Sequence, residues 1–392
     1  MNITNTHKGG TTIKKNKQKT QLKRYIPLIF FIILGIVCGF LAGLHSLFNI
    51  FENKTRTEIL FWFVFFFLGI YVALFLQILI HEVGHLVFGL LTGYKFSSLR
   101  IGSCMLVKEN GHLKIKWLSI SGTAGQCLLV PPESFDENAP FFLYNLGGSI
   151  LNSVSSFVFF MLYLRFENAM YFSTFLLSLI VIGVAFALLN GIPIKQLGND
   201  GYNISLFAKD RETLRYFLIQ LRIMEKVSRG IRLKDMPAEW FSILRIEEMK
   251  NSVLASMGVL DYNRLLDKYK IDEASQFMEQ LLSLDSLAGV HRNLLVCDRI
   301  YYEIIGENRK DVLDTMLDDT QKQFMKEMKK FPTVIRTKYA YELMVENDLE
   351  KAKKTMLEFE KIARTHPYSC DIESERELIN IVNQASDGIS AG

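Results

Sequence analysis

Long apolar runs fill the first half of this chain of 392 residues. They are rich in Phe, Leu, Ile and Val, and only short polar links and one mixed segment separate them. Because a helix needs about 20 apolar residues to cross a bilayer, we predict four membrane-spanning helices. They occupy about residues 25–47, 59–91, 140–164 and 170–189. The second run exceeds the length of one crossing, so its helix must tilt, kink or protrude.

The segment between the second and third spans, residues 94–137, has a different pattern. Glycines and prolines punctuate it, and apolar and polar residues partly alternate from Leu113 to Ile120. Such alternation is typical of strands, and the glycines and prolines mark turns. We therefore expect a small β-hairpin region here.

The remainder of the chain, residues 203–392, is rich in charged residues and shows helical periodicity. Between residues 349 and 365, apolar residues recur at spacings of three and four, with Lys and Glu between them. This pattern predicts an amphipathic helix. Further helices are expected at 271–282 and 294–305. The stretch 339–367 is similar to a tetratricopeptide helix pair, although no clean period of about 34 residues emerges.

Positive charge gathers at the amino end of the chain. Seven of the first 24 residues are Lys or Arg, and none is acidic. A solvated arm is the alternative, but a basic tail directly before an apolar run favours a topology with that end in the cytoplasm. Four crossings then return the chain to the cytoplasm. We expect a multi-pass protein of a bacterial plasma membrane, with both termini cytoplasmic.

The predicted fold class is therefore mainly α. A basic cytoplasmic tail (1–24) precedes a membrane-embedded domain (25–202), which contains the helix bundle and the β-hairpin region, and a cytoplasmic helical domain (203–392) follows. The net charge of +4 is too small to argue for nucleic-acid binding. Five scattered cysteines argue against a disulfide framework and against a cysteine-based zinc cluster.

The motif with the clearest chemistry lies near the end of the second span, where His81-Glu82-Val83-Gly84-His85 matches HExxH. Positions i and i+4 share one face of a helix, so both imidazoles can bind one metal ion, and Glu82 lies beside them to take a proton from water. An ionisable residue within an apolar span costs roughly 2.5–3.5 kcal/mol. The three ionisable residues of this motif therefore need a partner, and a zinc ion supplies it.

A hydrolytic zinc site usually has three protein ligands and an open position for water. The candidate for the third ligand is Asp200, which follows the fourth predicted span. The second and fourth spans run in the same direction, toward the cytoplasmic side. We therefore expect His81, His85 and Asp200 at the same membrane depth, holding one Zn²⁺ per chain.

Three motifs together resemble the site-2 protease family of intramembrane zinc metalloproteases. They are HExxH at 81–85, the segment Gly148–Asn152, which is similar to the family's GxxxN element, and Asn190–Pro193, which is similar to the NxxP segment that leads to Asp-Gly. The resemblance covers residues from about 59 to 202. The family pattern usually has an apolar residue before Asp-Gly and a second proline, whereas this chain has Asn199 there and no second proline. We therefore expect the loop before Asp200 to be shaped differently.

The resemblance implies a role for each matching residue. The three ligands named above hold zinc, and Glu82 acts as general base and then as general acid. Asn152 and Asn190 contact the substrate or stabilise the oxyanion. From the residues alone, hydrogen bonding between helices is the alternative for both asparagines.

The predicted activity is hydrolysis of a peptide bond in a membrane-associated protein or a small peptide precursor, near the cytoplasmic face. Regulated intramembrane proteolysis and peptide maturation both stay open. A helical substrate must unwind before cleavage, and we expect the β-hairpin region to hold the unwound strand. Residues 203–392 are expected to recruit the substrate or a protein partner. The alternative from another class is a catalytically silent membrane scaffold or transport accessory with a protease-like fold.

Overall fold

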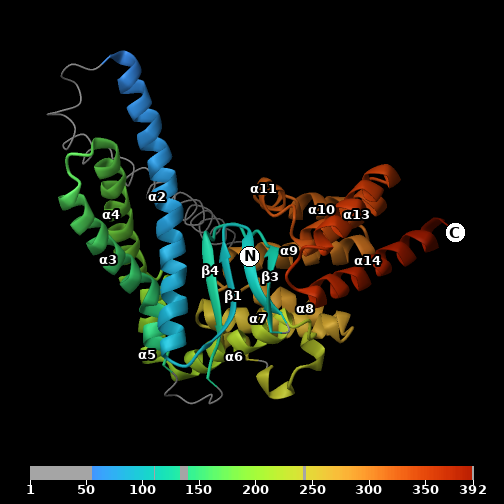
Figure 1. The fold of residues 1–392 in the computed structure, drawn as a ribbon. Coiled ribbons are helices and arrows are strands. Elements are labelled where there is room, and N and C mark those ends of the chain that lie inside the picture. Colours follow the sequence, from blue (N-terminus) through green and yellow to red (C-terminus); the bar gives the residue numbers. More distant parts are fainter. Residues whose placement is uncertain (1–54, 110, 133–139, 242–243, 391–392) are drawn as a thin grey trace, which may run out of the picture. The chain divides into compact units, whose positions relative to one another are not determined.

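Figure 1 shows the fold in a computed structural model, which describes residues 55–109, 111–132, 140–241 and 244–390. The predicted basic tail and first span lie outside the described residues. Within the described ranges the chain is mainly helical with one small antiparallel sheet, which confirms this part of the predicted fold class. The chain divides into two compact units, one formed by residues up to 85 and by 145–204, the other by 86–144 and 205–392.

Three helices in the described part of the chain are long and apolar enough to cross a membrane. They are α2 (Arg56–Leu91), α3 (Phe141–Arg165) and α4 (Met170–Gly191). Each agrees with one predicted span to within three residues at either end. With its 36 residues, α2 is about 54 Å long, which exceeds an apolar bilayer core of about 30 Å. The expectation that this helix is longer than one crossing is therefore met.

The first unit buries several polar side chains beside a small apolar core and exposes many apolar ones. Leu60, Phe61 and Tyr71 on α2 are 64–71% exposed, whereas Gln77 and Asn152 are fully buried. A water-soluble protein would remove such apolar surface from solvent, because its exposure to water is unfavourable. Lipid chains cover the same surface without this cost. The burial pattern, like the length of the helices, is that of a membrane protein.

The second unit contains a four-stranded antiparallel sheet with the strand order β3-β2-β1-β4. Its strands are β1 (Lys95–Ile101), β2 (Cys104–Glu109), β3 (His112–Trp117) and β4 (Gly125–Val130). The register pairs Leu99 with Leu106 and Leu106 with Ile115. Residues 94–137, predicted as a β-hairpin region, thus supply every strand of this sheet.

One face of the sheet packs against α6 (Arg211–Ser228). Met105 and Val107 of β2 are each 1% exposed and share an apolar core with Ile219 and Ile223 of α6. From the sequence, the strands were expected to belong to the membrane-embedded domain. In the structure they belong to the same compact unit as the C-terminal helices, because the buried face of β2 meets α6.

The rest of the second unit is helical. After α6 come α7 (Ser252–Asp267), α8 (Ile271–Leu282), α9 (Gly289–Ile305), α10 (Lys310–Met316), α11 (Asp319–Glu327), α12 (Pro332–Ala340), α13 (Leu349–Ala363) and α14 (Ser369–Ser390). Short 3₁₀ turns precede α7, and a π-helical segment, Tyr341–Val345, follows α12. The helices predicted at 271–282, 294–305 and 349–365 are confirmed. A tetratricopeptide-like repeat stays a prediction.

Candidate metal centre

Residues from two distant parts of the sequence converge in the first unit. His81 and His85 lie one turn apart on α2, and Asp200 begins α5 (Asp200–Lys209). Both histidines are buried, at 7% and 8% exposure. Among the described residues, these three side chains form the one group of His, Cys, Asp or Glu arranged to hold a metal ion.

The three candidate ligand atoms are nearly equidistant. His81 Nε2 lies 3.2 Å from His85 Nε2 and 3.1 Å from Asp200 Oδ2, and His85 Nε2 lies 3.3 Å from Asp200 Oδ2. Atoms that bind a tetrahedral zinc ion at about 2.0–2.1 Å are about 3.3 Å apart from one another. The triangle therefore has the size that zinc requires. Two imidazoles with one carboxylate are also a donor set found in hydrolytic zinc sites.

Two glycines allow α2 and α3 to approach closely beside the histidines. A Cβ atom on Gly148 would lie 2.4–2.7 Å from three ring atoms of His81, and one on Gly84 would lie 2.3 Å from the backbone oxygen of Gly147. Cβ atoms essentially never approach other heavy atoms closer than 3.0 Å. A side chain at either position would separate the helices or displace the ring of His81. The packing of this HExxH segment therefore depends on Gly84.

A buried amide fixes the orientation of the His81 ring. His81 Nδ1 lies 2.7 Å from Asn152 Oδ1. Since a carbonyl oxygen only accepts hydrogen bonds, Nδ1 carries the proton and Nε2 is left for a metal. Asn152 Nδ2 donates to the backbone oxygen and to Oε1 of Gln77, at 3.0 and 2.7 Å. Both ends of the Asn152 amide are thus used between helices, which corresponds to the alternative that the sequence left open for this residue.

Gln77 is a site residue that the sequence analysis missed. It lies one helical turn before His81 and is fully buried, and its Nε2 donates to the backbone oxygen of Leu179 in α4 at 2.9 Å. Gly183 leaves room for it, because a Cβ atom there would lie 2.6 Å from Gln77 Nε2. The signal in the sequence is an amide side chain four positions before the motif, within an apolar run. A chain of hydrogen bonds therefore connects α4 with His81.

Asn199 shapes the loop that precedes Asp200. Its Oδ1 accepts a hydrogen bond from the backbone N–H of Tyr202 at 3.0 Å, which caps the start of α5. Further hydrogen bonds connect the same side chain with the backbones of Leu189, Ile192 and Ile194. One amide thus ties the end of α4 to the start of α5 and puts Asp200 in the first helical position. An apolar residue in its place would make none of these bonds.

Close packing also fixes the position of Asp200. A Cβ atom on the adjacent Gly201 would lie 2.4 Å from the backbone oxygen of Gly191, so a larger residue would move the ligand. The ionised form of a carboxylate is the form that binds a metal, and Asp200 presents its Oδ2 to the Nε2 atoms of both histidines.

The two remaining predicted residues lie on the spans. Glu82 is 7% exposed and follows His81 on α2. Asn190 is half-buried near the end of α4, and its Nδ2 donates to the backbone oxygen of Phe186 at 3.1 Å. This hydrogen bond lies within one helix rather than between helices.

The chain matches no protein-family model, no curated protein and no solved structure. The resemblance to site-2 proteases therefore rests on the residues of this chain alone.

Proposed function

We propose that this protein is a zinc-dependent endopeptidase of the site-2 protease type, with its active site in the membrane. The observation that carries the proposal is the triangle of His81, His85 and Asp200, whose ligand atoms are 3.1–3.3 Å apart. Asp200 is 119 positions from His81 in the sequence, and packing alone does not require its carboxylate to lie at this distance from two imidazoles. The buried setting adds support, because three ionisable groups are retained there most readily when they bind an ion.

The roles of the residues follow from this arrangement. His81, His85 and Asp200 would hold the zinc ion, which when bound would supply a Lewis acid for a peptide carbonyl and for a water molecule, whose pKa falls to about 7 in such sites. Glu82 takes the proton of the attacking water and returns it to the leaving nitrogen. Asn152 and Gln77 position His81 rather than touch the substrate. Asn190 is the remaining candidate for contact with the substrate or the oxyanion.

The substrate class follows from the setting of the site. Exposed apolar residues cover the helices that carry it, so a substrate arrives as a membrane-associated protein or peptide. The first predicted span, residues 25–47, and the cytoplasmic termini are parts of this proposal. The helical domain, in tetratricopeptide form or otherwise, would then recruit a substrate or a partner on the cytoplasmic side. Regulated proteolysis and peptide maturation both fit this scheme.

Strand β3 has the properties of a site for an unwound substrate. It is an outer strand of the sheet, and Leu113, Ile115 and Trp117 are 54–65% exposed. The N–H of Trp117 donates to the backbone oxygen of Thr365 at 3.0 Å and so points away from β2. Along a strand, the backbone N–H and C=O groups of successive residues point alternately to the two edges. The N–H and C=O groups of Ile115 and Leu113 therefore point to the same outer edge as those of Trp117. A substrate strand can pair there by β-augmentation.

The decisive experiment compares the peptides of cells that express the native protein with those of cells that express Glu82→Gln. We expect a peptide or membrane-protein fragment that only the native protein produces. Glu82→Gln should retain zinc, because the three ligands are untouched. Glu58→Gln makes the same change at the other end of α2 and should leave the products unchanged.

Two results would contradict the proposal. Identical peptide profiles for the native protein and Glu82→Gln would remove the proteolytic function. Purified native protein without stoichiometric zinc would favour the alternative of a membrane scaffold or transport accessory without catalysis.

A further inference from the structure

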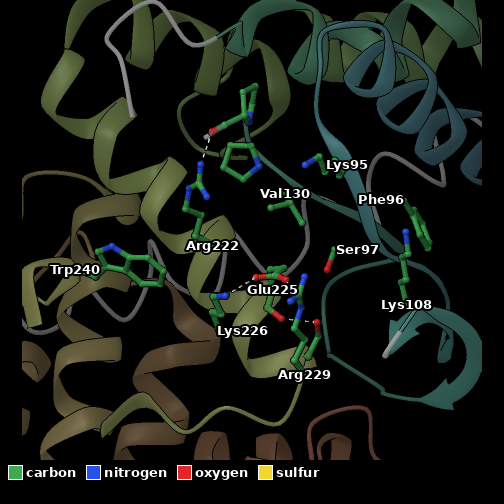
Figure 2. A pocket seen from close by; sticks show the side chains of 14 residues that line it. Lys95, Phe96, Ser97, Lys108, Val130, Arg222, Glu225, Lys226, Arg229 and Trp240 are labelled. Carbon is green, nitrogen blue, oxygen red and sulfur yellow. Dashed lines mark hydrogen bonds and ion pairs between the residues drawn. The ribbon is translucent and has the colours of Figure 1, made fainter. Parts of the chain in front are cut away.

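The second unit contains a cavity of about 540 Å³. Strands β1 and β2 and the segment after β4 form one side, and α6 forms the other (Figure 2). A volume of this size is typical of small-molecule sites, which measure about 300–1,000 Å³. All of its lining residues belong to the second unit, so the cavity is separate from the metal centre.

Positive charge dominates the lining of this cavity. Figure 2 shows cationic side chains on both sides, with Lys95 and Lys108 on the strands, Arg222 and Lys226 on α6, and Arg229 directly after α6. One carboxylate, Glu225, accompanies them and is 7% exposed. Five cations against one anion give the cavity a strongly positive potential.

The one carboxylate of the lining already has partners of its own. Glu225 Oε1 forms an ion pair with Arg229, and Oε2 lies 3.9 Å from Lys226 Nζ. Among the described residues, neither Lys95 nor Lys108 has a carboxylate within 4.0 Å. Two ammonium groups thus border the cavity without a counter-charge from this part of the chain. A bound anion would supply that charge.

The cavity also offers apolar and aromatic surface. Phe96, Val130 and Trp240 contribute to its lining beside the cations. A free inorganic ion would leave most of the volume unfilled. The combination fits an anion that carries a larger, partly apolar body.

The position of the cavity along the chain suggests where such a ligand comes from. Lys95 follows Leu91, the last residue of the candidate span α2, by four positions. Four residues extend at most about 14 Å, so Lys95 lies close to the end of a membrane helix. Basic sites at that level meet the headgroups of anionic lipids.

We propose that this cavity binds a phosphate ester, with Lys95 and Lys108 as the principal contacts to the phosphate. The ester is the headgroup of an anionic phospholipid or a soluble phosphate compound. Arg222 and Lys226 add positive charge from α6, and Trp240 packs against the body of the ligand. This site goes beyond the proposed proteolytic function and does not depend on it.

The test uses the full-length protein in a neutral detergent. Dihexanoyl phosphatidylglycerol and inorganic phosphate are titrated separately, and tryptophan fluorescence is measured. The chain has three tryptophans, of which Trp240 lines the cavity, so Trp240→Phe should abolish the response. In Lys95→Glu/Lys108→Glu we expect half-saturation to require at least tenfold more probe, since each charged contact contributes about a factor of ten. Lys250→Glu/Lys268→Glu, with the same charge change at exposed positions outside the cavity, should stay within twofold of the native protein.

Each outcome has a defined meaning. If the native protein binds the lipid saturably and Lys95→Glu/Lys108→Glu does not, the proposal is supported and the ligand is a membrane lipid. Saturable binding of phosphate at equal or lower concentration, lost in the same variant, supports it and assigns a soluble ligand. Absence of saturable binding of either probe overturns the proposal, as does binding that Lys95→Glu/Lys108→Glu leaves unchanged. Lys95→Met/Lys108→Met, which removes charge without reversing it, should show a smaller loss in the same direction.

Discussion

The imidazole of His81 has two nitrogens, and each has a different partner in the structure. Nδ1 bonds to Asn152, whereas Nε2 faces His85 and Asp200. The sequence predicted the histidine pair because the spacing in HExxH is a property of one helix. It did not predict the role of Gln77, whose hydrogen bond to Leu179 spans 102 positions and exists only because α2 packs against α4.

At the same scale, Gly148→Ala should weaken zinc binding roughly ten- to hundredfold, the usual effect of disturbing groups that orient a ligand. The added methyl group would lie within 2.7 Å of the His81 ring and would displace it. The measurement is zinc content of the purified protein after dialysis against a graded chelator series. Gly69→Ala is the matched control on α2, since its methyl group would meet only Phe175, at an ordinary 3.5 Å. Equal zinc retention by the two variants would contradict the close contact.

Among the elements, the membrane helices were the most predictable from sequence. A bilayer demands a continuous apolar length, and this demand is visible residue by residue in α2, α3 and α4. The grouping of the strands was not visible. Met105 and Val107 lie on one face of β2, and the grouping depends on which helix covers that face. Both α6 and a membrane helix have apolar residues that can pack there, and in the structure α6 does so. The shape of the loop before Asp200 was likewise not predictable from a sequence motif, because the side chain of Asn199 forms hydrogen bonds with four separate backbone groups.

The edge of β3 permits a test at the level of this element. Ile115→Pro removes an N–H that points away from β2, so the sheet itself should persist. If a substrate strand pairs there, cleavage should fall about three- to tenfold, the equivalent of one lost backbone hydrogen bond. The rate is measured by the appearance of the fragment found by peptidomics.

Two further variants at this edge separate the explanations. Ile115→Ala keeps the N–H and loses only side-chain contacts, so it should retain more activity than Ile115→Pro. Trp117→Pro is less informative, because it would also break the hydrogen bond to Thr365. Unchanged cleavage by Ile115→Pro would exclude β3 as the substrate strand's partner.

On the scale of the whole molecule, the two units differ in what they expose. The first unit buries hydrogen-bonded amides beside an apolar core and leaves many apolar side chains of its helices exposed. The second unit has the apolar core of a water-soluble protein, in which Asp261 is an exception. This residue of α7 is 2% exposed, and neither carboxyl oxygen has a hydrogen-bond partner among the described residues. Burial raises the pKa of Asp261 to about 7.

This carboxyl should make the stability of the second unit depend on pH. Its pKa is higher in the folded than in the unfolded state, so stability is fully present below about pH 4 and declines as pH rises toward 7. The loss amounts to as much as roughly 4 kcal/mol. Asp261→Asn should therefore flatten the decline, and its advantage in melting temperature should grow from pH 5 to pH 8.

Thermal unfolding of the full-length protein in neutral detergent, followed by tryptophan fluorescence, measures this difference. Asp272→Asn, at an exposed position in the first turn of α8, is the control and should follow the native curve. Parallel curves for Asp261→Asn and the native protein would show that Asp261 does not titrate in this range.

The close contacts of the glycines have a consequence for evolution. Gly84, Gly148, Gly183 and Gly201 each face atoms that a methyl group would strike, so each is a position where substitution requires a compensating change elsewhere. Descendants of a common ancestor should therefore keep glycine there even where the surrounding apolar residues drift freely. These four glycine positions, combined with the amide four positions before HExxH, define a signature by which distant relatives of this chain can be recognised.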